Sequence, residues 1–132
     1  MRRRGRAGGA PDRGAAAVEA ALVLPLLLLL VFGIIDFGRM LNAQIQLTEA
    51  AREGARARSV GASISEAEAR VQAVRTDAVL ANAGPACGLS SPPDQDATVT
   101  VSLDFDFVTP LGAMVGLVAP DLSSTGVMRC RG

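Results

Sequence analysis

Residues 20–35 read AALVLPLLLLLVFGII, which is a run of sixteen apolar residues. A helix that is apolar on every side leaves no face for water, so we place it in a membrane. Sixteen helical residues extend about 24 Å, which falls short of the roughly 30 Å hydrocarbon core of a bilayer. Starting the helix at Ala15 gives 21 residues and about 32 Å, and it brings Glu19 into the span. We predict a transmembrane helix over residues 15–41.

The charges on either side of this span set its orientation. Residues 1–14 form a basic leader with a net charge of +4, and the rest of the chain carries −4, because the whole chain is neutral. The charged residues of the leader are Asp12, Arg2, Arg3, Arg4, Arg6 and Arg13. Arginines next to an apolar span stay on the cytoplasmic side. We therefore expect a cytoplasmic N-terminus and an extracytoplasmic α+β domain over residues 42–132.

The composition argues against several classes of function. The chain has no histidine, and its two cysteines are too few for a four-thiolate metal site. Aromatic residues make up 3% of the chain and the net charge is zero, which argues against nucleic-acid binding. Asp104 and Asp106 share one face of an expected strand, but calcium requires about six to eight oxygen ligands. We expect no enzyme activity, no metal and no cofactor.

Two simple interpretations of the N-terminal part compete with a special role for Glu19. A secretory signal peptide needs a small-residue cleavage site, and residues 32–39, which read FGIIDFGR, contain none. An uncleaved signal anchor accounts for the arginines and the leucines but not for Glu19. A carboxylate in a transmembrane helix costs about 2.5–3.5 kcal/mol near the bilayer centre, so such a residue usually has a partner and a function.

Four short motifs between residues 14 and 58 indicate a family. Glu19 is the fifth residue after Gly14, and this spacing resembles the cleavage site of type IV prepilins, whose peptidase cuts after the glycine. The motifs are GAAAVE (14–19), LVLPL (22–26), GIIDFGR (33–39) and AAREGAR (50–56). Together they are similar to the TadE-like family, the pseudopilins of bacterial tight-adherence (Tad, or Flp pilus) systems. Ala20 departs from this family, whose members usually carry an aromatic residue there.

This resemblance implies a role for three residues. Gly14 would precede the cleaved bond, Ala15 would become the new N-terminus, and Glu19 would pair with the free amine of a neighbouring subunit and set the axial register. The chain would be a non-enzymatic minor pilin or pseudopilin that takes part in pilus assembly, secretion or adhesion. The implied partners are the prepilin peptidase, other pseudopilins, the major pilin, the inner-membrane assembly platform and membrane lipid, with no nucleic acid.

Helical periodicity continues beyond the span. Apolar residues recur at helical spacing, and charged residues of 49–56 occupy the opposite face. The apolar stripe comprises Met40, Ala43, Leu47, Ala50, Ala51, Gly54 and Ala55. It would pack either against the chain's own domain or against another subunit. Gly61 breaks this helix, and a second helix is expected to begin at a capping box of Ser65 and Glu68 and to end by Gly84.

The C-terminal part has the pattern of β-structure. Residues 98–107 alternate strictly between polar and apolar side chains, which predicts a half-buried antiparallel strand after a loop at 84–96. A return strand is expected over 123–131. The apolar connection 108–119 is too short to span a membrane, so we expect a short helix or a tip packed on the hairpin.

Cys87 and Cys130 both fall in the part expected outside the cytoplasm. Two thiols in a small exported domain usually pair, which predicts a disulfide between the loop and the last strand. Closing this loop would stabilise the domain by roughly 4 kcal/mol in the chain-entropy model. A bridge between two copies of the chain is the alternative.

Two other functions come from different classes. One is a signal-anchored extracytoplasmic binding protein with no role in a pilus. The other is an exported enzyme that acts through Asp104, Asp106 or a serine. Neither explains the spacing between Gly14 and Glu19.

Overall fold

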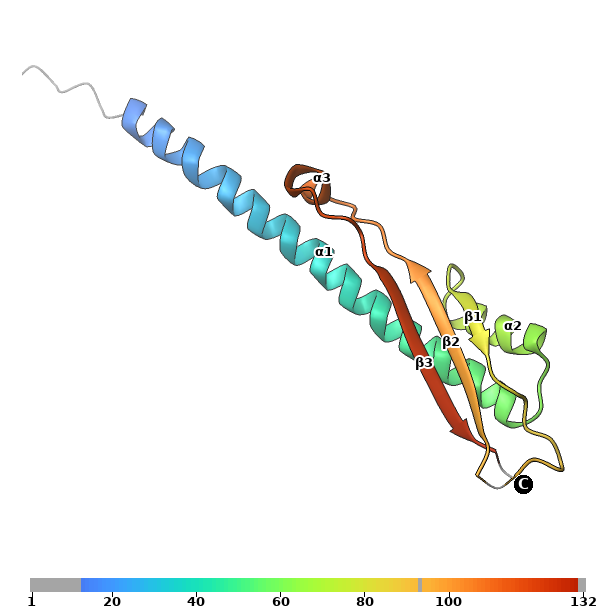
Figure 1. Cartoon of the computed structure of the whole chain (residues 1–132). Helices are drawn as coiled ribbons and strands as arrows, with labels where there is room; N and C mark the ends of the chain where they lie inside the picture. The colour runs from blue at the N-terminus through green and yellow to red at the C-terminus, as the bar shows by residue number, and fades with distance from the viewer. Residues whose placement is uncertain (1–12, 93, 131–132) are drawn as a thin grey trace, which may run out of the picture.

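The computed structural model describes residues 13–92 and 94–130, so residues 1–12 of the basic leader lie outside the described residues. A long helix carries a three-stranded antiparallel sheet along its C-terminal half (Figure 1). The elements follow the chain in the order α1 (Arg13–Ser59), α2 (Ile64–Val74), β1 (Val79–Ala83), β2 (Asp96–Asp104), α3 (Leu111–Val115) and β3 (Asp121–Arg129). The expected α+β class with a long apolar N-terminal helix is confirmed.

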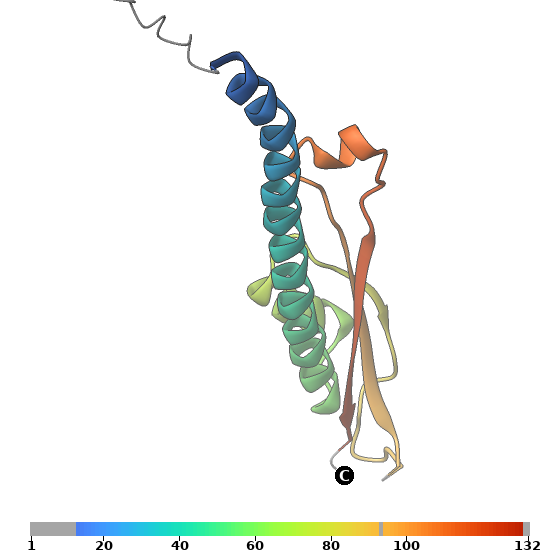
Figure 2. The same cartoon turned by 90° about the vertical axis from the view of Figure 1, so that its left-hand side faces the viewer.

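The long helix α1 consists of two parts with different surroundings. Every side chain from Gly14 to Val31 is exposed, and we call this segment the uncovered part of α1. From Asp36 onward, one face of α1 is buried against the rest of the chain (Figure 2). Within the residues that the structure describes, α1 is the one helix long and apolar enough to cross a membrane, and it continues through Pro25. The uncovered part fits a single-pass membrane anchor.

The apolar stripe on the second part of α1 packs against the chain's own sheet and against α2. Its most deeply buried members, with no exposed surface, are Leu47, Ala50, Ala51 and Ala55. Small side chains let the backbones approach: a Cβ on Gly54 would lie 2.9 Å from a methyl of Val71 and 3.0 Å from a methyl of Val99. The stripe is therefore occupied within the chain, and it is not available as a seam between subunits.

The sheet has the order β1-β2-β3, and β2 supplies its core face. Along β2 the side chains of Ala97, Val99, Val101 and Leu103 are buried in alternation with half-buried polar residues, which confirms the expected pattern. The strand ends at Asp104, earlier than expected, although Phe105 is still buried. β3 begins at Asp121 and pairs with β2 along its whole length. The connection between them contains the short helix α3, as expected.

The prediction for the segment between α1 and β2 was partly wrong. Its helix, α2, is capped by Ser63 and Glu66 and not by Ser65 and Glu68. The sequence contains two overlapping S-x-x-E patterns. The chain turns at Gly61, which has a φ of +88°, and the first pattern, residues 63–66, then lies at the start of the helix. Ala78 lies in the core but outside any helix.

The second helix ends at Val74, well before Gly84. Arg75 adopts an extended backbone there, and its guanidinium donates 2.7 Å to Oε1 of Gln46 on α1. The strand β1 follows and pairs with β2. Nothing in the short sequence VLANA alternates clearly, so this strand depends on a partner that is distant in the sequence.

The capping box of α2 is expected to make the stability of the fold depend on pH. The backbone N–H and the hydroxyl of Ser63 donate to the carboxylate of Glu66, and these bonds hold its pKa below the ordinary value of 4.5. A carboxylate with a lowered pKa stabilises the fold above its unfolded-state pKa, and the contribution is lost as the pH falls through the folded-state pKa. The wild type should therefore unfold at a higher temperature than Glu66→Gln at neutral pH. This difference in unfolding temperature should vanish in acid. A constant difference across this range would contradict the assignment.

Candidate functional site

Glu19 lies in the second turn of α1 on an otherwise apolar, uncovered surface. Its side chain is exposed, as are its neighbours Val18 and Leu22. It forms no hydrogen bond or ion pair with any residue that the structure describes. Helical geometry places Glu19 on the same face as Ala15, one turn nearer the N-terminus. In lipid, a carboxylate at this position would lack a counter-charge.

Gly14 stands in the first turn of α1, which begins at Arg13. An added Cβ on Gly14 would meet nothing within 4 Å. The first turn of a helix has backbone N–H groups without helical partners, and such ends open at little cost in free energy. The bond between Gly14 and Ala15 is therefore exposed, because none of the residues that the structure describes covers it.

The site that sequence reasoning missed is Asp36, which is buried to 3% exposure at the end of the apolar run. Its carboxylate accepts the N–H groups of Val108 at 3.2 Å and Thr109 at 3.4 Å, together with the hydroxyl of Thr109. These bonds tie the connection after β2 to α1 across 72 positions of sequence. The available signal was an acid directly after sixteen apolar residues and three positions before an arginine.

Arg39 completes this junction from the next turn of α1. Its guanidinium lies 3.9 Å from the Asp36 carboxylate, donates 3.3 Å to the carbonyl of Asp106, and sits 5.5 Å from the ring centre of Phe105. Phe105 in turn makes an edge-to-face contact with Phe107, with ring centres 5.9 Å apart. The junction thus combines hydrogen bonds, charge and aromatic packing where the uncovered part of α1 meets the covered part.

Removing the Asp36 carboxylate should release this junction without unfolding the sheet. Asp36→Ala leaves two amide N–H groups without an acceptor, which costs about 1–3 kcal/mol. We expect hydrogen exchange at the amides of Val108 and Thr109 to accelerate by roughly 10- to 100-fold. Asp36→Asn is the matched control, because it keeps one oxygen for those donors. Unchanged exchange in Asp36→Ala would show that the bonds contribute nothing.

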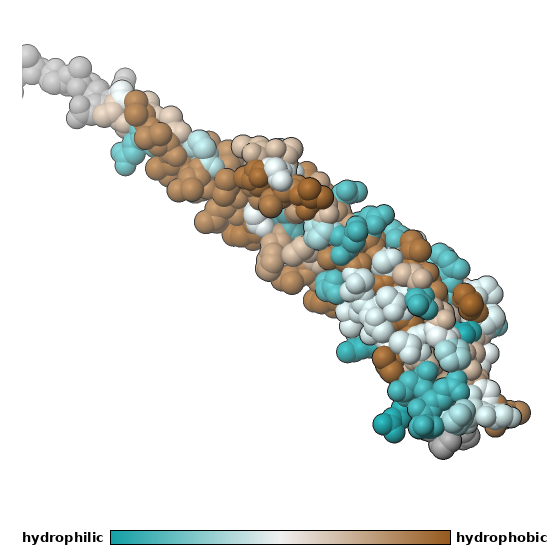
Figure 3. All heavy atoms as spheres, viewed as in Figure 1, coloured by the Kyte–Doolittle hydropathy of each residue, from teal (hydrophilic) through white to brown (hydrophobic). Residues whose placement is uncertain are grey.

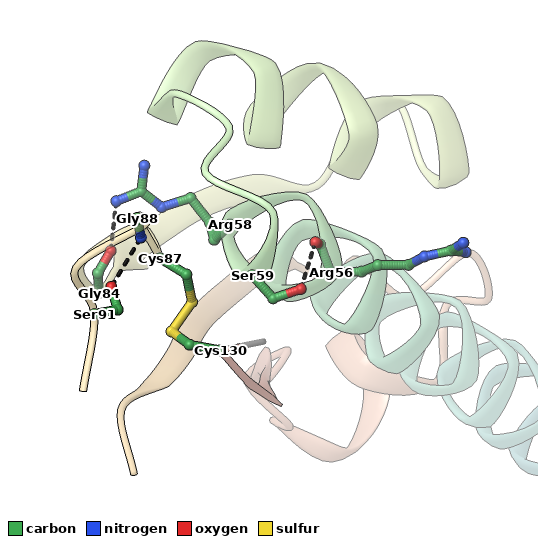
Figure 4. Close-up of a disulfide and its surroundings, with 8 residues drawn as sticks. All are labelled: Arg56, Arg58, Ser59, Gly84, Cys87, Gly88, Ser91 and Cys130. Atoms are coloured by element: carbon green, nitrogen blue, oxygen red, sulfur yellow. Dashed lines mark hydrogen bonds between the residues drawn. A yellow bond between two sulfur atoms is a disulfide. The ribbon is translucent and has the colours of Figure 1, made fainter. Parts of the chain in front are cut away.

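The two cysteines lie beside the C-terminal end of α1 (Figure 4), and Glu19 belongs to the N-terminal end of that helix (Figure 1). Cys87 and Cys130 of the same chain are joined by a disulfide with a Cα–Cα distance of 5.4 Å. The loop carrying Cys87 is fastened to the end of α1, where the Cys87 N–H donates 3.0 Å to the carbonyl of Arg58. Arg58 is buried, and its guanidinium donates to the carbonyls of Ala62 at 2.8 Å and Gly84 at 2.6 Å.

The acids that could have suggested catalysis or a metal do not form a site. Asp104 and Asp106 are both exposed near the end of β2. Within residues 13–92 and 94–130, no group of three or more His, Cys, Asp or Glu side chains is arranged to hold a metal ion.

Most of α1 is similar in sequence to a known protein family. Residues 14–56 match the family model described as TadE-like protein. This segment, about a third of the chain, is TadE-like. Comparisons with curated proteins and with solved structures found no match. The family match begins at Gly14 and ends inside α1, so it covers Glu19, Asp36 and most of the core-facing stripe, but no part of the sheet. At the level of the family, this match suggests an association with the Tad pilus.

Proposed function

We propose that this protein is a minor pilin-like subunit of a Tad pilus or secretion apparatus, matured by a prepilin peptidase that cuts between Gly14 and Ala15. Residues 15–41 would anchor it in the cytoplasmic membrane, with the N-terminus in the cytoplasm and residues 42–132 outside. One observation carries the proposal: Glu19 is an exposed acid on the uncovered part of α1, five residues after a glycine in the first turn.

Cleavage would change the electrostatics of the helix in two ways. It would remove the net charge of +4 carried by residues 1–14, which holds the helix end at the cytoplasmic face. It would also create a free amine at Ala15. In a packed bundle of such helices, this amine of one subunit would pair with Glu19 of the next, and each charge would offset the burial of the other. Because two isolated buried charges are costly, the pairing would favour one axial register.

The mature N-terminus tests the cleavage step. We expect intact mass and N-terminal peptide mapping of the protein from native membranes to give a chain that starts at Ala15. Gly14→Leu should retain the leader, whereas Gly9→Leu, a matched change within the leader, should be processed normally. An intact leader in the wild type would favour the signal-anchored binding protein. A start beyond Phe37 would indicate a cleaved signal peptide.

Glu19 is tested separately from cleavage. Breaking a buried charge pair costs about 3–5 kcal/mol, so Glu19→Gln should reduce co-purification with the other pilus subunits by at least about tenfold while leaving processing intact. Glu49→Gln is the matched control, because Glu49 is an exposed acid on the covered part of α1. Normal assembly of Glu19→Gln would argue for a membrane-anchored protein without a role in the pilus. A hydrolytic activity of the purified chain that is lost in Asp104→Asn or Asp106→Asn would favour the enzyme.

A further inference from the structure

Residues 107–118 belong to the connection between β2 and β3 and lie beside the uncovered part of α1 (Figures 1 and 2). We call this segment the hairpin tip. Its helix α3 approaches α1 closely enough that a Cβ on Gly33 would lie 3.8 Å from a methyl of Leu111. The two helices enclose an apolar groove lined by Pro25, Leu26, Leu28, Leu29, Phe32, Leu111 and Met114. The hairpin tip therefore sits at the level of the helix segment that is most apolar.

The hairpin tip has the surface of a membrane-embedded element. Residues 107–120 contain no charged side chain, and aspartates flank them at positions 106 and 121. Five of its large apolar side chains are exposed, with exposures of 67% for Val108, 72% for Met114, 50% for Val115, 56% for Leu117 and 90% for Val118. The apolar surface of α1 continues onto the tip (Figure 3). A contiguous apolar surface of this kind marks an interaction site.

Part of its backbone already has hydrogen-bond partners within the protein. Asp36 accepts the N–H groups of Val108 and Thr109, and within the tip Met114 donates to the carbonyl of Pro110 and Leu117 to that of Gly112. Lipid tolerates irregular backbone only where protein groups satisfy its hydrogen bonds. The cationic Arg39, with 46% of its side chain exposed, lies at the base of the tip, where a charged group can reach the headgroups.

We infer that the hairpin tip inserts into the outer leaflet of the bilayer beside α1 and gives the protein a second membrane contact. This inference rests on the proposed membrane span, but not on the proposed role in a pilus. With residues 15–35 covering the hydrocarbon core, Asp36 marks its outer boundary. Residues 29–33 of α1 then lie about 5–10 Å inside that boundary, and α3 is held at the same depth. Lipid is the occupant because the tip continues the same apolar surface that the span presents to it.

The chain contains no tryptophan, so single tryptophans can report the depth of each region. Met114→Trp and Val118→Trp probe the two sides of the tip, and the second guards against a local disturbance by the first. Leu22→Trp is the reference in the span, and Leu89→Trp, at a fully exposed loop residue, is the reference in water. Each full-length variant would be reconstituted into phosphatidylcholine and phosphatidylglycerol vesicles with or without brominated acyl chains.

We expect the two tip variants to match Leu22→Trp, with strong quenching by brominated lipid and a loss of quenching by aqueous acrylamide. Leu89→Trp should show the opposite pattern. Tip variants that behave like Leu89→Trp, with Leu22→Trp quenched by lipid, would overturn the inference and leave the span intact. Tip variants shielded from both quenchers would also overturn it and would indicate a protein partner. If Leu22→Trp is not quenched by lipid, the proposed span itself fails.

Discussion

Gly126→Ala is expected to reduce the free energy of unfolding by about 3 kcal/mol, at the upper end of overpacking effects. Gly126 lies on β3, opposite Val99 of β2, where the sheet rests on α1. A Cβ at this position would lie 2.8 Å from the backbone nitrogen of Arg52 and closer still to the carbonyl group of Ala51. Because these atoms belong to the helix backbone, no side-chain rotation can relieve the overlap. The added methyl group must push β3 and α1 apart.

Thermal unfolding of the full chain in detergent, followed by far-UV circular dichroism, measures this loss. Gly88→Ala is the matched control, since a Cβ on Gly88 would meet nothing within 4 Å and the residue has no positive φ. We expect the control to unfold at nearly the wild-type temperature. A Gly126→Ala protein of wild-type stability would mean that the sheet does not pack directly on α1.

Removing the disulfide is expected to have the largest effect, about 4 kcal/mol in the chain-entropy model. Cys87 and Cys130 are 43 positions apart, so the bond closes a long loop that includes β2, α3 and β3. The core that remains consists largely of alanine and valine, with Leu47, Leu103 and Phe105 as its larger members. Such a core buries little apolar area per residue, and a small domain of this kind depends strongly on a covalent link.

The Cys87→Ser, Cys130→Ser double variant should unfold at a much lower temperature than the oxidised wild type. Reductant should lower the unfolding temperature of the wild type toward that of the double variant and should leave the double variant unchanged. Non-reducing electrophoresis of the wild type is expected to show a monomer. A disulfide-linked dimer would indicate instead that the bridge joins two copies of the chain.

Most of the elements could be predicted from local pattern. The apolar run at 20–35, the helical stripe that follows it and the alternation of 98–107 each have a period that belongs to one type of secondary structure. The errors fell where local patterns were ambiguous. Two overlapping capping boxes gave the wrong start for α2, and β1 has too short and irregular a pattern to be distinguished from the end of a helix.

Only those site residues whose importance follows from their neighbours in the sequence could be predicted. Glu19 could be singled out because it falls inside the expected span 15–35, where a charge is costly. Asp36 could not be singled out, because its role depends on hydrogen bonds from Val108 and Thr109. Only the folded hairpin brings these two residues to Asp36. Arg58 was missed for the same reason, since its acceptors lie on two different loops.

Local patterns were enough to predict one long apolar helix, a basic N-terminal segment, a glycine and a glutamate at prepilin-like spacing, and a half-buried strand. These features follow from periodicity and from the free energy of transferring side chains out of water, which depend on residue type and near neighbours. Only the tertiary structure decided that the stripe of α1 faces its own sheet, that Gly126 must stay a glycine, and that the hairpin tip lies beside the uncovered part of α1. Those outcomes depend on contacts between distant segments, and such contacts leave no local period in the sequence.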